Sequence, residues 1–142
     1  MRITLELPSE TPFFVHPIQV RAADINYAGH LGNDRLLVYA QEARANWLWS
    51  LGFGELDIDG LGIILADAAL QFKNEAFAAE QLEVALYRGA DSKYGFDLFY
   101  DVTRDGVLIA RIKTAVLFYD YGQRCLAAPP KSLILQLPAA PH

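Results

Sequence analysis

The chain has 142 residues, in which 12 Lys and Arg stand against 17 Asp and Glu, so its formal net charge at pH 7 is −5. This length predicts a single domain over residues 1–142, with a core of about residues 13–130. The acidic balance argues against nucleic-acid binding and against a polybasic membrane anchor. The single cysteine, Cys125, excludes an internal disulfide, and we therefore expect a cytoplasmic protein.

Hydrophobic residues make up 53% of the chain, above the usual value of about 45–50%. This excess predicts that some apolar surface meets a second subunit or an apolar ligand. The longest apolar stretch, residues 61–72, contains Asp67 and is too short for a membrane-spanning helix. The first residues lack a signal-peptide pattern.

The first expected strand covers residues 13–20, which are apolar and partly β-branched. Residues 21–32 favour a loop, because alanines, glycines and turn formers replace the apolar pattern. A long helix is expected over residues 35–51, since apolar residues recur there at helical spacing. The members of this stripe are Leu36, Ala40, Ala43, Trp47 and Leu51.

The ends of the helix also have sequence signals. Asn33 or Asp34 is expected to cap its start, and Gly52 and Gly54 are expected to end it. Further apolar residues lie beside the stripe, so we expect the helix to be enclosed on much of its circumference.

Alternation and turn residues predict four strands after the helix. Asp105 and Gly106 should join the last two as a tight hairpin, and a turn is expected at residues 91–93. A short helix is expected at residues 133–137, followed by a frayed tail over residues 138–142. The four expected strands cover residues 61–72, 81–88, 95–103 and 107–119.

The expected order predicts an α+β domain in which an antiparallel sheet covers one long apolar helix. A curved sheet wrapped around a central helix satisfies this requirement. Such an arrangement resembles the hotdog fold.

Nine residues at fixed spacing carry a resemblance to a known family. They are Arg21, Asp24, Gly29, His30, Asn33, Tyr39, Glu42, Ala43 and Arg44. This pattern resembles that of the acyl-CoA thioesterases typified by 4-hydroxybenzoyl-CoA thioesterase. The resemblance implies a hotdog fold, a homodimer or homotetramer, and an acyl-CoA substrate without a separate cofactor.

Two positions depart from the family pattern. Asn26 stands where the family usually has a second Asp, and Gly32 replaces an Asn. In many members that Asp is the nucleophile or the base, and an amide can act as neither. Two hypotheses follow: a thioesterase that hydrolyses an apolar or aromatic acyl-CoA thioester, or a catalytically weak or silent protein that binds acyl-CoA. A third possibility is a dehydratase of the same fold, but this chain lacks the His-and-acid pattern expected for it in the middle of the helix.

The resemblance implies catalytic roles for Asp24, Asn26 and His30. Asp24 would replace the missing carboxylate, Asn26 would hold a water molecule or the carbonyl, and His30 would orient the substrate or act as an acid. Asp24 and His30 also have structural alternatives, because Asp24 can cap a turn and a His before a helix is often a hydrogen-bonded structural residue.

Substrate binding is expected from the same loop and from the helix. Backbone N–H groups near Gly29 or at the helix start would polarise the thioester carbonyl. The resemblance also allows a catalytic Glu42 on the helix, but pairing of Glu42 with a neighbouring cation is favoured. Asp67 either faces outward, which is favoured, or lies across the subunit interface. The three scattered histidines give no metal site. The expected substrate-binding residues are Tyr27, Gly29, Asn33, Tyr39 and Trp47.

Overall fold

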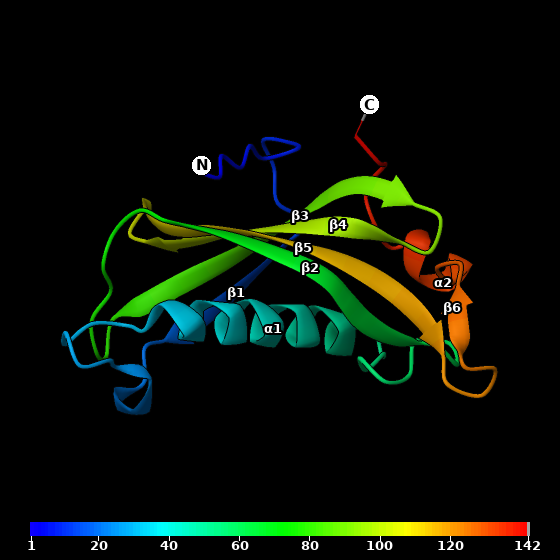
Figure 1. Ribbon diagram of the computed structural model, residues 1–142, viewed down its shortest axis with the longest axis horizontal. Helices are drawn as coiled ribbons and strands as arrows, with labels where there is room; N and C mark the ends of the chain where they lie inside the picture. Colours follow the sequence, from blue (N-terminus) through cyan, green and yellow to red (C-terminus); the bar gives the residue numbers. More distant parts are fainter. Residues whose placement is uncertain (142) are drawn as a thin grey trace.

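The computed structural model describes residues 1–141, in which a curved six-stranded antiparallel sheet lies over one long helix (Figure 1). The strands follow the order β1-β3-β4-β5-β2, and β6 pairs with β5. The elements are β1 (Phe14–Gln19), a 3₁₀ turn η1 (Ala22–Asp24), α1 (Asn33–Ser50), β2 (Gly62–Phe72), β3 (Gln81–Ser92), β4 (Gly95–Arg104), β5 (Val107–Asp120), β6 (Cys125–Ala127) and α2 (Lys131–Ile134).

Helix α1 packs one face on the sheet, as its apolar stripe predicts. Its opposite face, which includes Gln41, Glu42 and Trp49, is exposed. The expectation that the helix is enclosed on much of its circumference is therefore wrong, because the sheet covers only one side of it. Within residues 1–141, no helix combines the length and the hydropathy needed to cross a bilayer.

The start of α1 also differs from expectation. Its N-cap is Gly32, and among the described residues no side chain caps the helix. Asn33 is instead the first helical residue. Gly32 takes this place because its carbonyl accepts the first helical hydrogen bond, from the N–H of Arg35 at 3.0 Å, while its own N–H binds the carbonyl of Asp24 at 3.0 Å. At the other end Gly52 has φ +84°, the left-handed conformation typical of a residue that ends a helix.

The four strands expected after the helix are confirmed, but β3 is longer than predicted. A bulge between Arg88 and Asp91 lets β3 continue to Ser92, so the turn lies at residues 93–94 and not at 91–93. The turn of Asp105 and Gly106 is confirmed, with φ of +48° and +79°.

The C-terminal part contains one strand that was not expected, β6. Helix α2 begins and ends earlier than the predicted range of 133–137, and its Leu133 is buried in the core. Residues 138–141 form no helix or strand, and His142 lies outside the described residues.

A buried polar cluster joins α1 to the sheet. The Arg44 side chain is 3% exposed, and its Nε donates to Glu55 Oε1 at 2.8 Å. Its Nη1 donates to Tyr100 Oη at 3.1 Å. This Tyr100 hydroxyl also lies 2.8 Å from Thr114 Oγ1. Burial raises the pKa of Tyr100, so its hydroxyl stays neutral. Because each partner is hydrogen-bonded, the cluster is stable inside the core.

Candidate active site

The loop between β1 and α1 lies between two cavities at the N-terminal end of the helix. The first, of about 270 Å³, has His30 on its wall, and we call it the His30 cavity. The second, of about 410 Å³, has Asp24 on its wall, and we call it the Asp24 cavity. The His30 cavity is lined by His30, Leu31, Asn33, Leu36, Phe72, Lys73, Asn74, Glu75, Ala76 and Ile109. The Asp24 cavity is lined by Ala23, Asp24, Ile25, Asn26, Tyr27, Gly32, Asp34 and Arg35.

The carboxylate of Asp24 is buried and hydrogen-bonded. Tyr39 Oη donates to Oδ2 at 2.7 Å, and Arg21 Nε donates to the same oxygen at 3.1 Å. Arg35 Nε lies 3.7 Å from Oδ1. Burial by itself would raise the pKa of Asp24, but the hydrogen bonds from Tyr39 and Arg21 outweigh it and the pKa is lowered. Such a carboxylate ties the loop to α1 and is a weak base.

Asn26 folds the turn that leads to the helix. Its Oδ1 accepts the N–H of Ala28 at 2.9 Å and that of His30 at 3.4 Å, and its own N–H binds the His30 carbonyl at 2.9 Å. Gly29 completes the turn with φ +85°, and Tyr27 is fully exposed at the tip. A carboxylate at position 26 could accept the same two hydrogen bonds.

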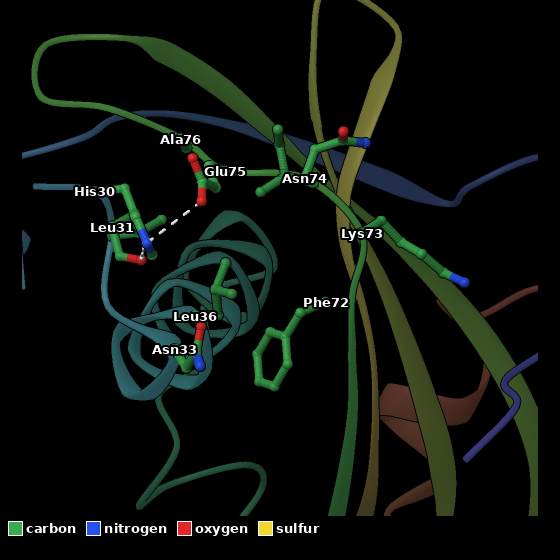
Figure 2. A pocket seen from close by; sticks show the side chains of 10 residues that line it. His30, Leu31, Asn33, Leu36, Phe72, Lys73, Asn74, Glu75 and Ala76 are labelled. Atoms are coloured by element: carbon green, nitrogen blue, oxygen red, sulfur yellow. Dashed lines mark hydrogen bonds and ion pairs between the residues drawn. The ribbon is translucent and has the colours of Figure 1, made fainter. Parts of the chain in front are cut away.

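His30 faces a residue that comes from a different part of the chain. Its Nε2 lies 3.6 Å from Glu75 Oε1, and its Nδ1 lies 3.3 Å from the carbonyl of Leu31. Figure 2 shows His30 and Glu75 facing each other beside the start of α1. Glu75 follows β2 and was not among the expected site residues. No motif points to it, although it lies on a loop directly after an expected strand.

Two of the three α1 residues expected to bind substrate lie in the core. Tyr39 is fully buried, and its hydroxyl contacts Asp24 and accepts the N–H of Arg21 at 3.3 Å. Trp47 is also buried and packs edge-to-face on Phe13, with ring centroids 5.0 Å apart. Neither lines the His30 cavity or the Asp24 cavity. Asn33 does line the His30 cavity, where Leu36, Phe72 and Ile109 form an apolar wall.

The start of α1 adds hydrogen-bond donors to the site. Asn33 lines one cavity and Asp34 the other, and the first N–H groups of a helix have no partner within the helix. These donors can stabilise negative charge that develops on an oxygen.

Two other acidic residues lie away from both cavities. Asp67 is exposed, as expected, and its Oδ1 lies 2.8 Å from Lys113 Nζ. Glu42 is exposed and forms no ion pair with any of residues 1–141, so the expected pairing with a cation is not seen. The same residues contain no group of three His, Cys, Asp or Glu side chains that could hold a metal ion.

A family model described as the thioesterase-like superfamily matches residues 20–137. The chain belongs to this superfamily. The match includes the loop, α1 and every strand from β2 to β6. It confirms the resemblance to thioesterases that the spacing from Arg21 to Arg44 indicated. A comparison with curated proteins found no match.

Solved structures share the fold of this chain. A 1,4-dihydroxy-2-naphthoyl-CoA thioesterase from Synechocystis is 24% identical with a TM-score of 0.79, covering 87% of this chain and 94% of its own. A gentisyl-coenzyme A thioesterase is 21% identical with a TM-score of 0.75, covering 84% and 98%. A hypothetical protein from Thermus thermophilus is 25% identical with a TM-score of 0.78, covering 87% and 96%. The hotdog fold is thereby confirmed.

Proposed function

We propose that this protein hydrolyses an acyl-CoA thioester whose acyl group is apolar or aromatic. The observation that carries the proposal is the composition of the His30 cavity. The apolar side chains of Leu36, Phe72 and Ile109 line this cavity together with the imidazole of His30 and with Asn33 at the start of α1. Pockets of this kind bind an apolar group and orient it with a few polar groups.

The start of α1 would act on the thioester carbonyl. Its free N–H groups point out of the helix end, where they can donate to an oxygen that gains charge in the tetrahedral intermediate. His30 would donate a hydrogen bond from its imidazole to the substrate and so orient it. In this proposal Asn26 shapes the loop that carries His30, through the two hydrogen bonds to its Oδ1.

The size of the cavity and two structural relatives support an aromatic acyl group. An apolar cavity of about 150 Å³ accommodates benzene, so about 270 Å³ is enough for one substituted ring. The relatives from the structural comparison act on 1,4-dihydroxy-2-naphthoyl-CoA and on gentisyl-CoA according to their names, and both acyl groups are aromatic.

A second candidate function is acyl-CoA binding without turnover. It is favoured by Asn26, an amide where the family has a carboxylate, and by the hydrogen bonds that occupy Asp24. A protein with the donors and the pocket but without a base would bind a thioester and leave it intact.

One experiment separates these two functions. Wild type and Asn26→Asp are assayed for release of free thiol from aryl-CoA and alkyl-CoA thioesters, and binding of a non-hydrolysable aryl-CoA thioether is measured by calorimetry. Hydrolysis requires thiol release by the wild type with an aryl preference. Binding without turnover is shown if the wild type binds the thioether and only Asn26→Asp, gaining about 10²–10⁴-fold from a positioned base, releases thiol.

We also propose that two copies pair through β2, which is one edge of the sheet. β2 has 11 residues, of which only Asp67 is charged, and the side chains of residues 65–68 are exposed. The other edge, β1, has six residues and contains Pro17, which has no N–H to donate to a further strand. A second copy on β2 would form a continuous sheet and cover exposed apolar surface.

A further inference from the structure

We propose that Glu75 is the carboxylate base of this site, taking the place of the acid that Asn26 cannot provide. The inference rests on the proposed thioester hydrolysis and assigns its base. Glu75 would remove a proton from a water molecule in the His30 cavity, next to the thioester carbonyl carbon.

Glu75 has the position and the exposure that such a base needs. Its side chain is 63% exposed and lines the His30 cavity, with Oε1 3.6 Å from His30 Nε2. Figure 2 shows its carboxylate directed toward His30, and Lys73 directed away from both. Among the described residues that line this cavity, Glu75 is the only one with a carboxylate. Its Oε2 forms no hydrogen bond with residues 1–141, so it is available to a water molecule.

The backbone around Glu75 is held on three sides. Before it, Asn74 donates from its N–H to the Ile109 carbonyl at 3.1 Å. At Glu75 itself, Arg104 Nη1 donates to the backbone carbonyl at 2.9 Å. After it, the carbonyl of Ala76 accepts the N–H of Leu31 at 2.7 Å. The fixed backbone places the exposed carboxylate of Glu75 at the wall of the His30 cavity.

The other carboxylates near the loop are less suitable. Asp24 is 4% exposed, and both of its oxygens face cations or the Tyr39 hydroxyl. Asp34 lines the other cavity. A base must lie within hydrogen-bond reach of the proton that it abstracts, directly or through one water molecule, and of these three only Glu75 shares a cavity with His30.

The step balances without any further reactant. An O–H bond of water breaks, its proton moves to Glu75, and the oxygen forms a bond to the thioester carbon. The carbonyl electron pair moves to its oxygen, beside the N–H groups of α1. The electron pair on this oxygen then re-forms the carbonyl double bond and the carbon–sulfur bond breaks. The thiolate of coenzyme A takes the proton from Glu75. The products are a carboxylic acid and free coenzyme A.

The test uses Glu75→Gln, with Glu83→Gln as the matched control. Glu83 is an exposed glutamate on β3 that lines neither cavity. We expect Glu75→Gln to lower kcat by about 10²–10⁴-fold, with affinity for the aryl-CoA thioether and the melting temperature both unchanged. The control should retain wild-type kcat. A Glu75→Gln kcat within threefold of wild type overturns the assignment and leaves the proposed hydrolysis standing.

Chemical rescue tests whether the carboxylate itself is required. In Glu75→Ala, added formate should enter the open space beside His30 and restore part of the lost kcat, whereas formate should not affect Glu83→Ala. Loss of kcat without rescue in Glu75→Ala would show a structural role and overturn the assignment. A wild type that binds the thioether but releases no thiol would overturn the proposed hydrolysis together with its base.

Discussion

The hydroxyl of Tyr39 has a structural partner in Asp24, 2.7 Å away inside the protein. Removing it in Tyr39→Phe leaves a buried carboxylate short of one donor, which costs about 1–3 kcal/mol of unfolding free energy. We expect the melting temperature to fall by about 2–4 °C per kcal/mol, with KM unchanged. Thermal denaturation and steady-state kinetics measure the two effects. A higher KM at an unchanged melting temperature would instead assign Tyr39 to the substrate.

The lowered pKa of Asp24 predicts a pH dependence of stability. Burial opposes ionisation, but the hydrogen bonds from Tyr39 and Arg21 reverse the effect. The folded state therefore binds the proton less tightly than the unfolded state, whose pKa is about 3.9. The resulting stabilisation is complete above that pH and is lost as the pH falls through the lower folded pKa. Urea unfolding from about pH 6 to about pH 2 should show a steeper loss in wild type than in Asp24→Asn.

The sequence predicted where the loop residues lie better than it predicted which residues they contact. The spacing from Arg21 to Arg44 identified the family and placed Asp24 and His30 on one loop before a helix. Tyr39 lies in the same motif, but periodicity does not tell whether a hydroxyl points into a cavity or toward a neighbouring loop. Glu75 lies 45 positions after His30, and only the closure of the sheet around α1 brings the two together.

At the scale of single elements, β2 carries the proposed subunit contact. Leu65 on β2 and Val15 on β1 are each 43% exposed and lie on opposite edges of the sheet. Leu65→Lys would place two like charges near each other across a twofold interface, so the dimer dissociation constant should rise by at least about tenfold. Val15→Lys should leave it unchanged. Sedimentation equilibrium measures both, and equal effects of the two variants would contradict pairing through β2.

Regular patterns predicted the longer elements and missed the irregular ones. Alternation predicted both ends of β4 and of β5 with an error of no more than one residue. The end of β3 was missed because the bulge after Arg88 shifts the register by inserting residues. β6 has only three residues and depends on its pairing with the end of β5, so its own sequence contains too little pattern to predict it.

For the whole molecule, the net charge of −5 should slow the approach of an acyl-CoA, whose phosphates are also negative. Salt screens this repulsion, since the Debye length falls from about 30 Å at 0.01 M to about 8 Å at 0.15 M. We therefore expect kcat/KM to rise with ionic strength over this range. Initial rates at substrate concentrations below KM measure it. A fall would show that a local cation such as Lys73, on the wall of the His30 cavity, governs the encounter.

The buried cluster of Arg44, Glu55, Tyr100 and Thr114 sets the position of α1 along its own axis. Apolar contacts alone would allow the helix to slide or rotate, because they are not directional. The hydrogen bonds from the Arg44 guanidinium to Glu55 and Tyr100 are directional, so they do not allow such a movement. Arg44 lies eleven residues after Asn33, about 16 Å along the helix, so the cluster acts as a distant anchor that fixes where the first turn of α1 meets the His30 cavity. A shift of α1 at Arg44 would therefore displace the first turn of the helix relative to the His30 cavity, although no residue of the cluster lines that cavity.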